Sequence, residues 1–109
     1  MIFLPMLAAT VAAATPLTST DPDVRCAAVL AYQVGQAKAE DQAKLMASLS
    51  YFLGKVKGRD ATANLETLLR GTYHGDPNLL ADNAQRCVTE LQHLGAEMQA
   101  AGAALTANP

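Results

Sequence analysis

The sequence predicts an all-α fold, a compact four-helix domain with one disulfide, preceded by a cleavable signal peptide. In four successive segments, apolar residues recur at spacings of three and four, which is the period of an amphipathic helix. An Asp-Pro pair opens both the first and the last segment; Asp caps a helix and Pro suits its first turn. No segment alternates apolar and polar residues as a half-buried strand does.

The chain opens with the pattern of an export signal. Residues 2–14 are an uncharged, largely apolar run that ends in Ala12-Ala13-Ala14, an A-x-A cleavage signal. Such a run is too short to span a bilayer, which needs roughly 20 residues. We therefore expect residues 1–14 to be a signal peptide and the mature protein to be periplasmic or secreted. The alternative is an N-terminal helix buried in a cytosolic domain.

The first two helices are expected over residues 22–38 and 41–57. Asp21 caps the first, and Gly35 weakens its last turn. Gly58 is a natural stop after the second. The apolar stripe of the second helix consists of Leu45, Met46, Leu49, Phe52, Leu53 and Val56.

The last two helices are expected over residues 61–73 and 77–104. Asp60 provides a cap for the third helix, and Asp76 provides one for the fourth. The third helix has an apolar face of Leu65, Leu68, Leu69 and Tyr73. The stripe of the fourth consists of Leu80, Ala84, Cys87, Val88, Leu91, Leu94, Met98 and Leu105.

The chain of 109 residues has room for one domain. We expect that domain to span residues 22–105. Residues 15–21 are polar and should form a flexible mature N-terminus, and residues 106–109 should form a loose tail.

Cys26 and Cys87 are the only cysteines. An even number of cysteines in a small exported chain predicts a disulfide, and closing a loop of this length stabilises a fold by roughly 4 kcal/mol. The bridge requires the two Cα atoms to lie within about 7 Å, so the first and last helices should lie side by side. The alternative is a pair of free, buried thiols.

Composition argues against several function classes. The net charge is −2, from ten acidic and eight basic residues, whereas a nucleic-acid-binding protein needs a basic face. The sequence contains no haem-attachment, phosphate-loop or nucleophile-elbow motif, and the disulfide leaves no nucleophilic cysteine. We therefore expect a non-catalytic protein with no cofactor, no nucleic-acid partner and no stable membrane span.

Glu90 and His93 are the weak candidates for a metal site. Their Glu-x-x-His spacing places both side chains on one helix face, as in di-metal carboxylate bundles. Those bundles repeat the motif on two helices and add two further glutamates, and this chain has neither. The simpler interpretation is a surface pair of side chains.

A possible interaction surface lies near the end of the second helix and consists of Tyr51, Gly54, Lys55, Lys57, Gly58 and Arg59. The cations could bind an anionic partner, or they could complement the helix C-terminus. The two glycines could allow another backbone to approach, either inside the bundle or from a second protein. Tyr51 and Phe52 are adjacent in sequence and point to different faces of the helix, so one of them is expected to be exposed.

Cys26, the stretch from Tyr51 to Arg59 and Cys87 together resemble small sphingomonad-type exported proteins with no assigned role. More distantly, the chain is similar to the group that contains the periplasmic acid-stress chaperone HdeA and the immunity proteins against type VI secretion amidases. The resemblance implies a small, helical, disulfide-bonded periplasmic protein. Phe52, Gly54 and Gly58 loosely match the aromatic and glycine stretch of the immunity branch. Residues 99–109 carry no charged side chain, unlike the Lys-rich ends of the chaperone branch.

The leading hypothesis is a non-catalytic interaction protein, an inhibitor, immunity protein or stress-related binder, whose partner is another protein or a second copy. One alternative is an acid-activated periplasmic chaperone. At low pH its acidic residues would be protonated, and apolar surface would become exposed. The other is a small metal-binding or enzymatic domain that uses Glu90 and His93.

Overall fold

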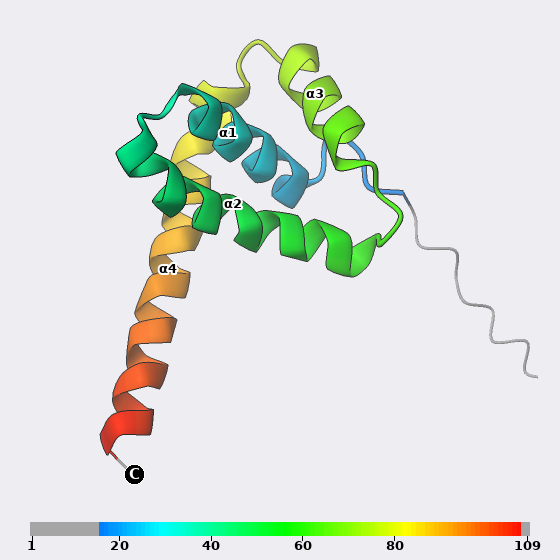
Figure 1. Ribbon diagram of the computed structural model, residues 1–109. Coiled ribbons are helices and arrows are strands. Elements are labelled where there is room, and N and C mark those ends of the chain that lie inside the picture. Colours follow the sequence, from blue (N-terminus) through cyan, green and yellow to red (C-terminus); the bar gives the residue numbers. More distant parts are fainter. Residues whose placement is uncertain (1–15, 108–109) are drawn as a thin grey trace, which may run out of the picture.

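The computed structural model describes residues 16–107, and these residues form four helices and no strand. The helices are α1 (Pro22–Gln36), α2 (Ala39–Arg59), α3 (Leu65–Gly75) and α4 (Leu79–Ala107), shown in Figure 1. The predicted all-α class with four helices is confirmed. The predicted signal peptide, residues 1–14, lies outside the described residues.

The helix starts show which capping predictions were correct. The Asp21 carboxylate accepts hydrogen bonds from the backbone N–H groups of Asp23 and Val24, as predicted for α1. The cap of α3 is Asn64, which accepts from the N–H of Thr67 at 3.1 Å. The prediction of Asp60 as that cap is wrong, because Asp60 instead bonds Thr62 in the turn that leaves α2.

Two predictions about the chain ends need correction. Residues 106–107 belong to α4 and are not a loose tail, because the helix continues through Ala107. Ahead of α1, the N–H of Asp21 donates to the carbonyl of Thr18, and the guanidinium of Arg25 donates to the carbonyl of Ser19. These bonds hold residues 18–21 in a turn against α1, where a flexible terminus was predicted.

Helix α1 is the centre of the fold, and the other three helices each pack mainly against it. Most of its first nine residues are buried, including the continuous run from Cys26 to Leu30. A helix that is apolar around most of its circumference is stable only when neighbours cover it on several sides. This explains why α2, α3 and α4 surround α1 instead of forming a square bundle.

The disulfide between Cys26 and Cys87 joins α1 to α4, with a Cα–Cα distance of 5.5 Å. The predicted bridge is confirmed, and with it the neighbouring position of the first and last helices. The two cysteines are buried in one apolar cluster with Ala27, Leu30 and Phe52, the last contributed by α2.

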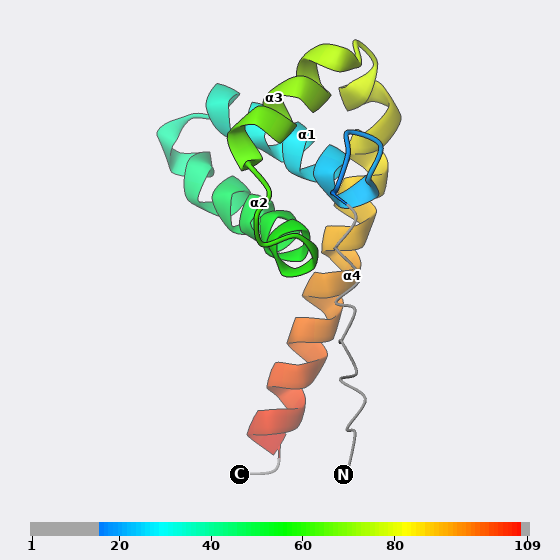
Figure 2. The same ribbon diagram turned by 90° about the vertical axis from the view of Figure 1, so that its right-hand side faces the viewer.

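The second half of α4 leaves the body that α1, α2 and α3 form. Figure 1 and Figure 2 both show this half as a single helix that continues away from the other three. Every residue from 96 to 107 is exposed. The apolar stripe predicted along the whole helix therefore packs in its first half only, and the side chains of Met98 and Leu105 remain 64% and 77% exposed. Among the described helices, none combines the length and the apolar character that crossing a bilayer requires.

Candidate functional site

An apolar groove lies where α4 passes α2 and begins to leave the body. The groove has a volume of about 580 Å³. Helix α2 contributes Lys44, Ala47, Ser48 and Tyr51 to its lining, and α4 contributes Val88, Leu91, Gln92, Leu94, Gly95 and Met98. Leu105, on the same stripe of α4 two turns beyond Met98, adds an exposed apolar side chain past the end of the groove.

The groove arises because two helix surfaces diverge. Tyr51 packs edge-on against the buried ring of Phe52, with 4.9 Å between the ring centroids, and forms the wall of the groove on α2. Leu91 packs against the core cluster around the disulfide. Beyond it, Gly95 has no side chain to fill the space. Four of the α4 residues in the groove belong to the predicted apolar stripe, namely Val88, Leu91, Leu94 and Met98. Gln92 and Gly95 do not, and the periodicity of the stripe does not predict a surface groove.

Ion pairs at the N-terminal end of α1 hold that end to α2 and α4. The ammonium of Lys55 lies 2.8 Å from a carboxylate oxygen of Asp23 and 2.6 Å from one of Glu90. The guanidinium of Arg59 lies 2.9 Å from oxygens of both Asp21 and Asp23. Three helices far apart in sequence are thus connected by one cluster of opposite charges.

The network shifts the pKa values of its members. The hydrogen bond from Arg59 is the main cause that lowers the pKa of Asp21. Burial raises the pKa of Glu90, but hydrogen bonds from Lys55 and Tyr51 outweigh it, so the net shift is downward. The same carboxylate, as an acceptor, raises the pKa of the Tyr51 hydroxyl. Burial lowers the pKa of Lys55, but its bonds to Asp23 and Glu90 raise it overall.

These shifts predict an acid-sensitive fold. A carboxylate whose pKa is lower in the folded state adds stability above its unfolded pKa, and this stability is lost as the pH falls through the folded value. The ordinary pKa values of Asp21 and Glu90 are 3.8 and 4.5. The free energy of unfolding should therefore decrease as the pH falls below about 5, because both carboxylates become protonated. Urea unfolding at a series of pH values measures this loss.

The control for that experiment is a matched pair of substitutions. Glu90→Gln should flatten the dependence of stability on pH, because the amide does not titrate. Glu40→Gln, at an exposed carboxylate of α2 that has no ion-pair partner among the described residues, should leave it unchanged. Equal pH profiles for the two variants would contradict the role given to Glu90.

The predicted interaction surface is divided among different environments. Lys55 and Arg59 are engaged in the ion pairs, and the ammonium of Lys57 donates to the carbonyls of Ala61 and Ala63 at 3.2 and 2.7 Å. These bonds support the interpretation that the cations stabilise the end of α2. They do not support the other interpretation, in which the cations bind an anionic partner. Tyr51 alone of the predicted set lines the groove.

Gly54 and Gly58 are exposed, and a Cβ atom built on either of them meets no neighbouring atom within 4 Å. The prediction that these glycines permit tight packing inside the bundle is therefore wrong.

The open space at Gly54 leads to a prediction. Gly54→Ala should raise the free energy of unfolding by about 0.5–1 kcal/mol, since alanine loses less backbone entropy in a helix than glycine. Ala43→Gly, at an exposed position of the same helix, should lower it by a similar amount. Thermal unfolding followed by circular dichroism checks both, and a destabilised Gly54→Ala variant would reveal a contact at this position.

The weak metal candidates lie apart from other ligands. The Glu90 carboxylate is bound by Lys55, and the His93 side chain is exposed on α4. Within residues 16–107, no three His, Cys, Asp or Glu side chains come together in a way that could hold a metal ion.

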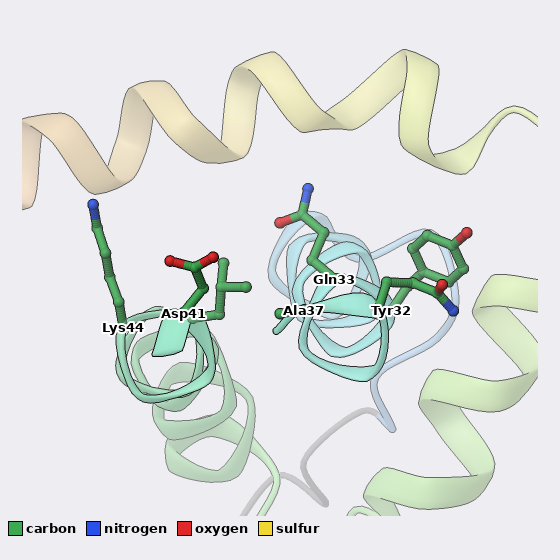
Figure 3. Close-up of a pocket in the computed structure, with 7 residues that line it drawn as sticks. Tyr32, Gln33, Ala37, Asp41 and Lys44 are labelled. Carbon is green, nitrogen blue, oxygen red and sulfur yellow. The ribbon is translucent and has the colours of Figure 1, made fainter. Parts of the chain in front are cut away.

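A second, shallower cavity lies at the corner between α1 and α2, with a volume of about 440 Å³. Figure 3 shows that its polar side chains diverge, with Tyr32 pointing away from Asp41 and Lys44. Lys44 extends toward α4 and also lines the apolar groove. This cavity therefore lacks the convergent polar groups that orient a small ligand.

Comparison with known proteins adds no family assignment. The chain matches no protein-family model, no curated protein and no solved structure. Its function must therefore be argued from the groove, the projecting helix and the disulfide described above.

Proposed function

We propose that this chain is a non-catalytic interaction protein that acts outside the cytoplasm and binds another protein chain through the apolar groove and the projecting half of α4. The uncovered apolar face of α4 is the observation that carries the proposal. Val88, Met98 and Leu105 are large apolar residues that lie exposed on this helix. Contiguous exposed apolar surface on a small protein marks a site of association.

The length of the projecting segment supports the same conclusion. Residues 96–107 make up about three helical turns, and every one of them is exposed. Isolated helices of this length are marginal in water, because their stability in proteins comes from packing of the apolar face. A partner that packs along the segment provides the missing contact.

The absence of a catalytic role is also part of the proposal. Catalytic groups commonly have shifted pKa values inside a cleft, although structural ion pairs shift pKa values as well. Here the shifted carboxylates, Asp21, Asp76 and Glu90, each bond a basic side chain from another helix. We interpret these pairs as structural, and the groove as a surface for apolar contact.

The proposed location rests on the disulfide, which persists in oxidising compartments such as the periplasm. Expression of the full sequence in a bacterium with two membranes tests it. We expect the periplasmic fraction to contain a chain that begins at Thr15 and lacks free thiols, measured by intact mass with and without a thiol reagent. Recovery of the full-length, reduced chain from the cytoplasm alone would contradict the proposal.

Site-specific photocrosslinking tests the binding surface. A photoreactive residue at Met98, in the groove, should give covalent adducts with a protein in the periplasm of its source cells. The same residue at Ala100, exposed on another face of α4, is the matched control and should give few. If neither position gives adducts, or both give equal amounts, the proposed surface is wrong.

The ion-pair network favours a second candidate function, that of an acid-activated chaperone. Protonation of Asp21 and Glu90 removes charges that hold the start of α1 to α2, and α2 to α4. Loosening of these helices would expose the buried apolar side chains beneath them, such as Phe52. Light scattering of an aggregating test protein near pH 3 examines this idea. Equal aggregation with and without the chain would reject it.

A further inference from the structure

We infer that the partner on the groove is a second copy of this chain, and that the two copies pair through an antiparallel contact between their α4 helices. The inference rests on the interaction surface proposed above and names its occupant. The small and apolar residues of α4 share a regular spacing. Ala84, Val88, Leu91, Gly95, Met98, Gly102 and Leu105 follow one another at alternating spacings of four and three.

That alternation is the heptad repeat of helices that pair with each other. Three heptads cover the helix from the disulfide-bonded core to its exposed end, so the seam continues where the body of the protein stops. Only the first part of the seam is covered within one chain, by α1 and α2. Beyond Met98, which still lines the groove opposite α2, the seam residues Gly102 and Leu105 are exposed.

An antiparallel register matches the large residues of one copy to the glycines of the other. When Met98 lies opposite Gly95 of the second copy, Leu91 lies opposite Gly102, and Val88 lies opposite Leu105. A Cβ atom at Gly95 or Gly102 meets nothing within 4 Å in the single chain, so both positions have room for an incoming side chain. Glycine also allows two helix backbones to approach closely.

The same register fills the groove of each copy. The end of α4 of one copy, around Leu105, then lies beside Val88 of the other, next to Tyr51 of the groove wall. A two-fold axis produces the reciprocal contact, as in most homodimers. Each projecting helix thus covers the groove of its neighbour while its own apolar face is covered.

Charge is complementary in this arrangement. Lys44 lines the groove from α2, and neither Lys44 nor Glu97 has an ion-pair partner within residues 16–107. Glu90 forms an ion pair with Lys55 of α2. Glu97 lies one heptad after Glu90, so both side chains point to the side of α4 that α2 occupies. In the antiparallel pair, Glu97 of the second copy lies level with residue 96, beside Lys44 of the first.

A lipid surface fits the exposed helix less well than a second copy. Helices that lie on membranes carry lysine and arginine on their polar face to bind anionic headgroups. After Arg86, α4 has neither residue, and its charged side chains are Glu90 and Glu97. The charges on this helix would therefore repel an anionic bilayer.

Sedimentation of the oxidised mature chain between about 1 and 100 µM tests the inference, and we expect a reversible dimer. Met98→Glu should raise the dimer dissociation constant at least about tenfold, because it buries a charge in the seam. Ala100→Glu, on the outer face of the same helix, is the matched control and should dimerise like the unchanged chain. Circular dichroism establishes that both variants remain folded.

Two further measurements address the pairing and the register. Lys44→Glu and Glu97→Lys should each weaken the dimer, and their combination should restore it. A photoreactive residue at Leu105 should label the region of Val88 in the second copy, which peptide mapping of the crosslinked dimer detects. Labelling around residue 105 instead would indicate parallel helices and would overturn the proposed contact.

The outcomes separate this inference from the proposed function. A chain that is monomeric at all concentrations, yet crosslinks to a different protein at Met98, would retain the interaction surface and overturn the second copy as its occupant. A chain that forms neither a dimer nor adducts at Met98 would overturn both. A dimer that Met98→Glu and Ala100→Glu affect equally would overturn the α4 contact.

Discussion

Loss of the disulfide is expected to lower the free energy of unfolding by about 4 kcal/mol. Cys26 and Cys87 are 61 residues apart in sequence, so their bond removes much of the conformational freedom of the unfolded chain. Small domains have total stabilities of about 5–15 kcal/mol. The reduced protein should therefore unfold at a clearly lower urea concentration and temperature than the oxidised protein.

Urea titration of the oxidised chain, the reduced chain and the double variant Cys26→Ala/Cys87→Ala measures this effect. The reduced chain and the double variant should agree, since alanine fills much of the space of the buried thiols. If the free energy of unfolding of the reduced chain is lower by less than about 1 kcal/mol, the unfolded state is already compact. The chain-entropy argument assumes an unfolded state that is not compact.

Phe52→Ala is expected to destabilise the protein by about 3–5 kcal/mol. The ring is fully buried, and it lies in the cluster that surrounds the disulfide. Its removal takes away apolar contact and leaves a cavity that the bridged helices α1 and α4 cannot close by moving together. The Lys55 ammonium, which lies 5.6 Å from the ring centroid, would lose that contact as well.

Met46→Ala is the matched control on the same helix. Its side chain is 53% exposed, so the substitution should change the free energy of unfolding by about 0.5 kcal/mol or less. Both variants are compared with the unchanged chain in urea under oxidising conditions. A similar, small effect at the two positions would show that α2 contributes little to the core, contrary to the packing described above.

Some of the surface features depend on helix lengths, which the sequence pattern predicts only in part. Helix α1 has 15 residues and α4 has 29, so α4 is about 20 Å longer than the helix it packs against. The apolar stripe of α4 was predicted correctly as a stripe, but periodicity does not indicate which neighbour covers it. Half of α4 is exposed because the helix extends past the neighbours that pack beside it, which depends on the positions of the helices in the fold.

The ion pairs illustrate the same limit. Lys55 and Arg59 stand out in the sequence as neighbouring cations one turn apart on the same helix. Their partners, Asp21 and Asp23 at the start of α1 and Glu90 on α4, are more than 30 residues away in the chain. No spacing rule connects residues at such distances, so the sequence offers only two local interpretations, a patch for an anionic partner or cations that complement the helix C-terminus.

Local patterns were thus sufficient for the four helices, because each helix is held by bonds between residues four apart, and for the single bridge, because only two cysteines are present. The tertiary arrangement decided which apolar faces are covered, how the charges pair and where the groove lies. These features arise from contacts between segments that are distant in the chain, and their free energies depend on which surfaces the folded protein brings together.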